Sequence, residues 1–169
     1  MFACRLYCLA VALVFPLLAV GAQVPFADDL PVTVKHYNRA APMVATAGAP
    51  AVEDLAALKQ AGIEVLVDFR RPQEGTAAYA AAAEELGLAF HHLPMGREQP
   101  DKEQVSALSA ILEKHQDQPV LLYCASGNRA GTMWALHLLE SGASADQAIA
   151  AGLTAGMAGS RVEWITAWE

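Results

Sequence analysis

The sequence predicts an α/β domain built around a mostly parallel sheet. Apolar runs of strand length occupy residues 63–69, 88–94 and 119–124, and the first of them is rich in isoleucine and valine. Segments with the apolar spacing of amphipathic helices separate these runs. Strands that alternate with helices of this length form βαβ units, so we expect parallel strands with helices on both faces of the sheet.

The amino-terminal half contributes the first of these elements. A short edge strand is expected over 32–37, followed by a helix over 51–62 that its final glycine closes. The strand over 63–69 comes next. Pro72 is expected to open the following helix, which ends at Gly87.

The carboxyl half repeats the alternation. After the strand over 88–94 and a polar loop, Asp101 is expected to cap a helix that runs to about residue 116. The strand over 119–124 leads into a helix over 129–141. Two short helices, over 145–150 and 153–168, are expected to complete the domain.

Residues 1–22 are typical of a secretory signal. Arg5 precedes an apolar run, and Ala22 supplies the small residue of a cleavage site. The run has about 15 residues, fewer than the roughly 20 that span a membrane, and an uncleaved anchor is the alternative. We therefore expect an exported protein, periplasmic or secreted, with a linker over 23–42 and a single catalytic domain over 43–169.

The net charge limits the classes of binding partner, and the cysteine content indicates a candidate reactive residue. The formal net charge is −7 and no basic run occurs, so neither nucleic acid nor a membrane surface is expected as a partner. Cys4 and Cys8 belong to the signal, which leaves Cys124 as the one thiol of the mature chain. An unpaired cysteine in an exported protein is either a small buried apolar residue or a reactive thiol.

The neighbours of Cys124 favour the reactive thiol. The residue ends a strand and precedes a helix, and ligands of parallel sheets bind at that edge. The first N–H groups of a helix have no partner within the helix and, with the helix dipole, attract an anion. We therefore predict Cys124 as a nucleophile and Arg129 as its cationic partner. The expected anion-binding loop comprises Ala125, Ser126, Gly127, Asn128 and Ala130.

Three further residues are candidates for roles around this loop. Glu98 and Asp101 are possible general acids, although Asp101 is expected mainly as a helix cap. Arg70 follows a strand and could bind an anionic substrate or pair with a nearby carboxylate. His91 and His92 are adjacent on a strand and face opposite ways, so we expect no metal site and no cofactor.

The stretch "YCASGNRAG" resembles the active loop of cysteine phosphatases and rhodaneses. From about residue 43 to residue 164, the chain resembles the beta-lactamase-hydrolase-like phosphatase-like domain family. The segments that carry this resemblance are "AVEDLAALKQAGIEVLVDFR", "EELGLAFHHLP" and "VLLYCASGNRAGTMWAL". The resemblance implies a fold like that of dual-specificity phosphatases, with a four- or five-stranded sheet and a cysteine loop that leads into a central helix.

Two departures from the phosphatase pattern bear on function. Four residues separate Cys124 from Arg129, whereas tyrosine-phosphatase-like enzymes have five, and the shorter loop resembles that of rhodaneses. Neither Glu98 nor Asp101 lies in the tryptophan-proline-aspartate arrangement that supplies the general acid of the phosphatases.

These departures favour transfer of sulfane sulfur from thiosulfate or a persulfide, through a persulfide on Cys124. Hydrolysis of a phosphate ester through a phosphocysteine is the alternative, as in tyrosine and dual-specificity phosphatases. In either reaction the partner is a small anionic substrate. A non-catalytic module that binds an anion or a partner is the third interpretation.

Overall fold

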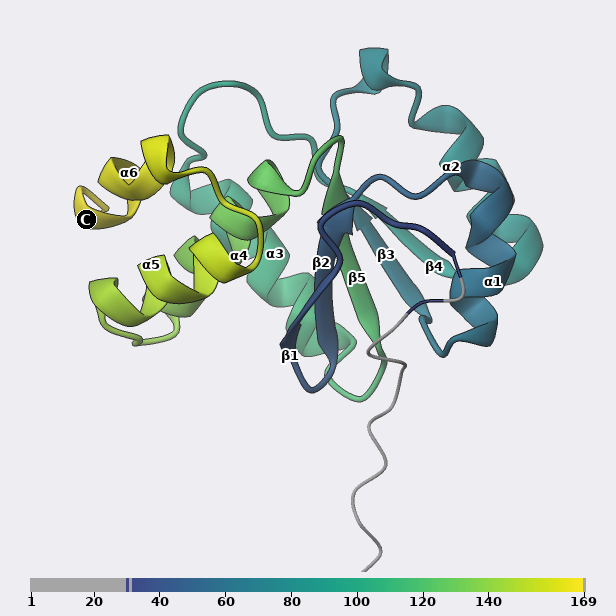
Figure 1. The fold of residues 1–169 in the computed structure, drawn as a ribbon, viewed down its shortest axis with the longest axis horizontal. Coiled ribbons are helices and arrows are strands. Elements are labelled where there is room, and N and C mark those ends of the chain that lie inside the picture. Colours follow the sequence, from purple (N-terminus) through teal and green to yellow (C-terminus); the bar gives the residue numbers. More distant parts are fainter. Residues whose placement is uncertain (1–29, 31, 169) are drawn as a thin grey trace, which may run out of the picture.

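The computed structural model describes residue 30 and residues 32–168, and it places them in a layered α/β fold (Figure 1). The described residues form one five-stranded sheet in the order β1-β2-β5-β3-β4. Only the β1–β2 pair is antiparallel, and the other neighbouring strands are parallel. The predicted class is thus confirmed. The strands are β1 (Asn38–Ala41), β2 (Val44–Gly48), β3 (Val65–Asp68), β4 (Ala89–His92) and β5 (Val120–Cys124).

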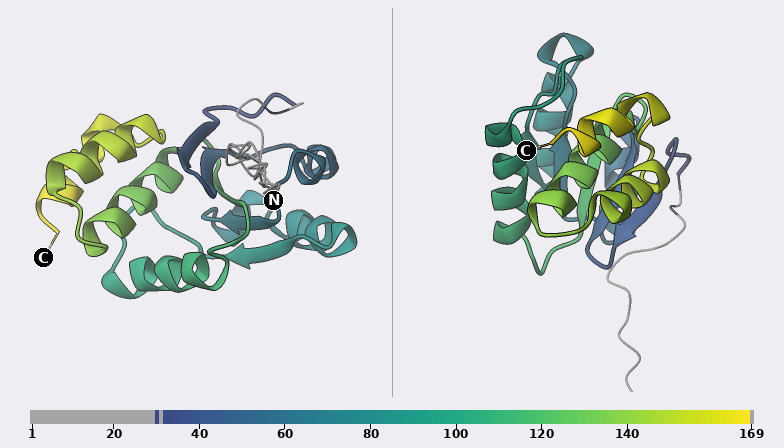
Figure 2. Two further views of the ribbon diagram at one scale, coloured as in Figure 1. Left: turned by 90° about the horizontal axis from the view of Figure 1, so that it is seen from below. Right: turned by 90° about the vertical axis from the view of Figure 1, so that its left-hand side faces the viewer.

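Helices cover both faces of the sheet (Figures 1 and 2). One face carries α1 (Leu55–Gln60) and α2 (Ala77–Leu86), and the other carries α3 (Lys102–Lys114) and α4 (Asn128–Glu140). The helices α5 (Ala145–Thr154) and α6 (Val162–Thr166) pack on α4, and α5 also contacts the edge strand β1. Three short 3₁₀ helices complete the set: η1 (Val52–Asp54), η2 (Pro72–Glu74) and η3 (Gly159–Arg161).

The alternation of side chains along β5 divides the core in two. Leu121 and Tyr123 point to the core beneath α1 and α2, whereas Leu122 and Cys124 point to the core beneath α3 and α4. β5 has a parallel neighbour on each side, and all of its residues are buried. Cys124 therefore ends the central strand, on the face that α4 covers.

Capping residues set the ends of several helices. The Asp101 carboxylate accepts a hydrogen bond from the backbone N–H of Gln104 at 2.8 Å, and the Gln104 side-chain oxygen accepts one from the backbone N–H of Asp101. Ser144 and Gln147 form the same arrangement at the start of α5. Gly87 ends α2 with a φ of 65°, a left-handed conformation that favours glycine. The predicted cap at Asp101 and the predicted end at Gly87 are confirmed.

The edge of the sheet differs from the prediction. The edge strand is β1 rather than the segment over 32–37, and β2 was not predicted at all. Strand β2 reads "VATAG", whose alanines and glycine have weak strand preference. Its residues form a strand because β5 pairs with them along their whole length. The sheet thus begins inside the segment over 23–42, for which we expected a linker with a short edge strand.

Two predicted helices are interrupted. Pro72 begins the 3₁₀ turn η2, which Gly75 ends with a φ of 82°, and α2 starts only at Ala77. The helix predicted over 153–168 is likewise divided among the end of α5, η3 and α6, and Gly156 adopts a φ of 98° after α5. Glycine at a positive φ terminates a helix, and apolar spacing alone does not reveal the break.

The predicted signal over 1–22 and its cleavage after Ala22 lie outside the described residues. Among the residues that the structure describes, no helix combines the length and apolarity needed to cross a membrane.

Candidate active site

The β5–α4 loop carries the predicted nucleophile at the carboxyl edge of the sheet. Cys124 is 1% exposed, whereas Ala125 and Ser126 are exposed to solvent. Gly127 then adopts a φ of 88° at the amino terminus of α4. A Cβ at Gly127 would make an ordinary contact with the Cβ of His36 at 3.4 Å, so it is the positive φ that favours glycine there. The sequence correctly placed this turn between strand and helix.

Contacts with the segment after α5 hold the first turn of α4. The Asn128 side chain accepts a hydrogen bond from the backbone N–H of Ala158 at 2.8 Å. The helix approaches this segment so closely that a Cβ on Gly131 would lie 2.4 Å from the backbone nitrogen of Met157. Backbone N–H groups in this first turn have few partners within the helix and can bind an anion.

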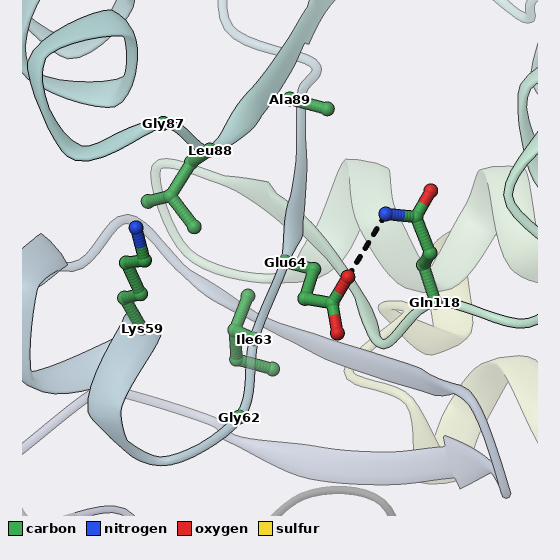
Figure 3. A pocket seen from close by; sticks show the side chains of 8 residues that line it. All are labelled: Lys59, Gly62, Ile63, Glu64, Gly87, Leu88, Ala89 and Gln118. Carbon is green, nitrogen blue, oxygen red and sulfur yellow. Dashed lines mark hydrogen bonds between the residues drawn. The ribbon is translucent and has the colours of Figure 1, made fainter.

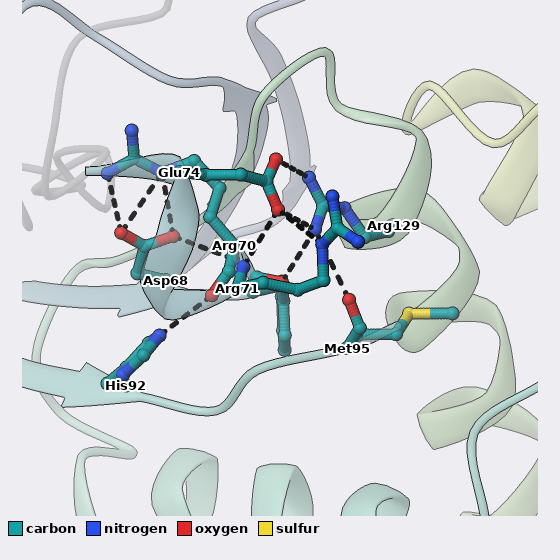
Figure 4. A network of polar contacts seen from close by, with 8 residues as sticks. Asp68, Arg70, Arg71, Glu74, His92, Met95 and Arg129 are labelled. Atoms are coloured by element: carbon teal, nitrogen blue, oxygen red, sulfur yellow. Dashed lines mark hydrogen bonds and ion pairs between the residues drawn. The ribbon is translucent and has the colours of Figure 1, made fainter. Parts of the chain in front are cut away.

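Arg129 is held firmly beside the loop (Figure 4). Its Nη1 and Nη2 donate to the two carboxylate oxygens of Glu74 at 2.8 and 2.6 Å. Nη1 also lies 3.2 Å from the carbonyl oxygens of Phe69 and Met95. The hydrogen bonds to Glu74 raise the pKa of Arg129, burial opposes them, and the electrostatic interaction with the nearby Cys124 adds to the increase. The fixed cation and the thiol are thus brought together, as the sequence predicts.

Glu74 is the main site residue that sequence reasoning missed. It ends η2, and its carboxylate also accepts a hydrogen bond from the backbone N–H of Arg71 at 2.8 Å. The hydrogen bond from Arg129 lowers the pKa of Glu74 to about 2, against the opposing effect of burial. The carboxylate is therefore ionised at neutral pH and can only accept hydrogen bonds. The available signal was a glutamate in the turn that follows β3, the neighbour of β5.

Arg70 lies away from the loop and forms the ion pair that we considered as its alternative. Its Nε and Nη2 donate to the Asp68 carboxylate, with the shortest contact at 2.6 Å. The guanidinium lies 4.0 Å from the ring centre of Tyr79 and 5.4 Å from that of Tyr123. Both rings belong to the core on the opposite face of the sheet from Cys124. Arg70 is 5% exposed, so this position favours a structural role over contact with substrate.

The two candidate general acids lie on the loop between β4 and α3. The Asp101 carboxylate caps α3, whereas Glu98 is exposed in the middle of the loop. The same loop supplies the Met95 carbonyl that contacts Arg129, and Gln99 donates to the carbonyl of Trp164 at 3.2 Å. Glu98 thus extends from a segment attached both to the Arg129 side chain and to α6.

Arg161 is a second residue that the sequence did not reveal. It ends η3, and its Nη1 donates to the Thr132 hydroxyl of α4 at 3.1 Å. Burial lowers the pKa of Arg161, the electrostatic interaction with Cys124 opposes this decrease, and the charge of Arg129 adds to it. The site therefore has a second cation, contributed from the carboxyl-terminal part of the chain.

The side chains of His91 and His92 have different partners, as expected for neighbours on a strand. His91 Nε2 lies 2.9 Å from Nε2 of His115, and His92 Nε2 lies 2.7 Å from the carbonyl oxygen of Arg70. Within the described part of the chain, no three metal-ligating side chains are grouped closely enough to hold an ion.

A pocket of about 430 Å³ lies at the opposite edge of the sheet (Figure 3). It surrounds the amino ends of β3 and β4, and Gln118 donates to Glu64 across it at 2.9 Å. None of the predicted site residues lines it.

Solved structures of low sequence identity share this fold. A candidate phosphatase from Neisseria meningitidis is 22% identical with a TM-score of 0.65, over 75% of this chain and 94% of that one. The active form of Tk-PTP is 19% identical with a TM-score of 0.66, over 78% and 93% of the two chains. The catalytic core of the PP-IP phosphatase SIW14 from S. cerevisiae is 14% identical with a TM-score of 0.60, over 82% and 88%. At these identities the likeness establishes a phosphatase-like fold.

The comparison with curated proteins found no match. A family model does match, over residues 37–142, and its description is "Beta-lactamase hydrolase-like protein, phosphatase-like domain". The matched region covers more than half of the chain and contains β1 to β5, Glu74, Cys124 and Arg129. The chain therefore belongs to the family of phosphatase-like domains of beta-lactamase hydrolase-like proteins.

Proposed function

We propose that this protein is a cysteine-dependent phosphatase that hydrolyses phosphate monoesters through a phosphocysteine on Cys124. The observation that carries the proposal is the Arg129–Glu74 pair, which fixes a guanidinium beside a cysteine at the amino terminus of a helix. Family membership and the phosphatase-like fold support this alternative better than the sulfur transfer that the four-residue spacing favoured.

The first step needs an anion site and a nucleophile. The loop N–H groups and the helix dipole bind the phosphate oxygens, and Arg129 balances their charge. The Cys124 thiolate attacks phosphorus, the bond from phosphorus to the ester oxygen breaks, and the departing alkoxide takes a proton. In the second step water attacks phosphorus, the S–P bond breaks, and inorganic phosphate leaves with the thiolate restored.

Glu98 is the proton donor that we propose for the leaving alkoxide. Asp101 already accepts the capping hydrogen bond of α3, and Glu74 is ionised and engaged with Arg129. Glu98 is exposed on the loop that contacts Arg129, where it can meet the outer part of a bound ester.

Sulfane-sulfur transfer remains a second candidate because of the four residues between Cys124 and Arg129. A persulfide adds one sulfur atom to the cysteine and needs less room than a phosphoryl group. Thiosulfate also releases sulfite as an anion, so this reaction needs no general acid.

A paired assay separates the two chemistries. The purified protein and its Cys124→Ser variant are supplied with an aryl phosphate or with thiosulfate plus cyanide. We expect phosphate release that depends on Cys124 and little thiocyanate. Thiocyanate formation without phosphate release would establish sulfur transfer instead, and activity in neither assay would favour a binding module.

A further inference from the structure

Arg161 is anchored against the first turn of α4. Its Nη1 donates to the Thr132 hydroxyl at 3.1 Å, and its guanidinium lies over the Trp164 ring at 4.6 Å from the ring centre. The Thr132 hydroxyl in turn donates to the carbonyl oxygen of Asn128 at 2.7 Å. The guanidinium thus lies next to the first turn of α4, which directly follows the β5–α4 loop.

The backbone before Arg161 runs along that loop. The N–H of Ala158 donates to the Asn128 side chain at 2.8 Å, and a Cβ on Gly156 would lie 3.4 Å from the carbonyl oxygen of Gly127. The segment from residue 156 to residue 161 therefore forms one side of the anion-binding loop.

Arg161 differs in charge balance from the other buried arginines. Arg70 is paired with Asp68, and Arg129 is paired with Glu74. Among the described residues no carboxylate forms an ion pair with Arg161, whose partners are a hydroxyl group and an aromatic ring. Cys124 interacts electrostatically with this cation but does not form an ion pair with it, so a bound anion would supply a hydrogen-bonded counter-ion.

We propose that Arg161 binds a second anionic group of the substrate, next to the phosphate that Cys124 attacks. The inference rests on the proposed phosphatase function, in which Arg129 and the loop N–H groups already hold the first phosphate. Arg161 is hydrogen-bonded to Thr132 at the side of the loop, so it contacts the substrate group next to the first phosphate. The preferred substrates are therefore phosphate esters or anhydrides that carry a second phosphate beside the first. Arg161 lies beyond the matched residues 37–142, so the family model does not describe this feature.

The test compares the binding of inorganic phosphate and inorganic pyrophosphate to the whole protein by calorimetry, without turnover. Wild-type protein is expected to bind pyrophosphate about tenfold more tightly than phosphate or better. Arg161→Gln should abolish most of this preference and leave phosphate binding within about twofold. Arg161→Lys, which keeps the charge, should retain part of the preference. Lys114→Gln removes the same charge from the far end of α3 and should behave as wild type.

Several results would overturn the proposal. One is wild-type protein that binds pyrophosphate no more tightly than phosphate, and another is an unchanged preference for pyrophosphate in Arg161→Gln. A third is an equal loss of affinity for phosphate and pyrophosphate in Arg161→Gln, which would assign Arg161 to the first phosphate. Because binding needs no catalysis, the proposed function is judged separately. An Arg161-dependent preference in a protein that hydrolyses no phosphate ester would contradict the phosphatase proposal alone.

Discussion

At the scale of single residues, one carboxylate controls the geometry of the site. Glu74 holds both terminal nitrogens of Arg129, while its own position is fixed by the backbone N–H of Arg71. Without the carboxylate charge, the guanidinium would keep only the carbonyl contacts of Phe69 and Met95. The position of the guanidinium that we propose to bind phosphate therefore depends on Glu74.

Replacement of Glu74 should impair catalysis through this positioning. We expect Glu74→Gln to lower kcat/KM for an aryl phosphate about 10- to 100-fold, since a misplaced catalytic group typically costs that much. Steady-state kinetics measure the effect, and most of it should appear in kcat. Glu113→Gln, an exposed change on α3, is the matched control. Equal kinetics in the two variants would show that Arg129 does not need its partner.

The proton donor gives a second prediction at this scale. Glu98→Gln should reduce kcat for a phosphate ester with a poor alkoxide leaving group about 100-fold, within the usual range for general acid catalysis. Esters of acidic phenols should be much less affected, because their leaving groups need no proton. A uniform loss across leaving groups would remove Glu98 from the proton-donor role.

At the scale of elements, the contact between β4 and α3 should make stability depend on pH. His91 meets His115 of the turn after α3, and Gln118 and Glu64 continue this polar chain. Burial lowers the pKa of His91, and the charges of His115 and Lys114 lower it further.

A lowered histidine pKa means that the unfolded chain binds the proton more readily than the folded one. The stability contributed by neutral His91 is thus complete above the unfolded pKa of about 6.5 and is lost as the pH falls below it. Urea unfolding at pH 7.5 and pH 5.0 should show this loss in the wild type and a smaller loss in His91→Gln. The same loss in both proteins would assign the effect to other groups.

The packing of α4 on α5 gives another prediction. A Cβ added at Gly131 would lie within 2.9 Å of three backbone atoms, the nearest at 2.4 Å. The Cβ of Gly131→Ala can therefore be accommodated only if the helices separate. We expect a destabilisation of about 3 kcal/mol in chemical unfolding, the upper end for overpacked cores. Gly159→Ala is the control, because nothing lies within 4 Å of its added Cβ. If both variants unfold alike, the close approach of the two helices is not as described.

Local sequence patterns predicted some elements better than others. The strands β3, β4 and β5 stand out as apolar runs, and Asp101 marks the start of α3 by its capping pattern. Strand β2 could not be found this way, because its alanines become a strand only through pairing with β5. The breaks at Gly75 and Gly156 depend on positive φ angles that apolar spacing does not report.

At the scale of the whole molecule, the order of the strands assembles the site. β5 lies between β2 and β3, so the turn after β3 brings Glu74 to Arg129, and the loop after β4 brings Met95. The sequence identified Cys124 and Arg129, because both lie in one continuous motif. It did not identify Glu74 or Arg161, which are 55 and 29 residues from their partners and meet them only in the folded chain.

Because of this long-range arrangement, loop length describes only part of the surroundings of Cys124 and Arg129. The number of residues between Cys124 and Arg129 describes one loop, whereas the anion site also includes η2, the β4–α3 loop and η3. Arg70, which sequence proximity placed near the edge, instead pairs with Asp68 on the other face.

The covalent intermediate is the most direct test of the phosphatase proposal. The protein is rapidly quenched during turnover of an aryl phosphate, digested, and its peptides are analysed by mass spectrometry beside the Cys124→Ser variant. We predict a phosphate group on the wild-type peptide that contains Cys124, and none in the variant. Phosphate release that continues in Cys124→Ser, or turnover with the label on another residue, would contradict the phosphocysteine mechanism.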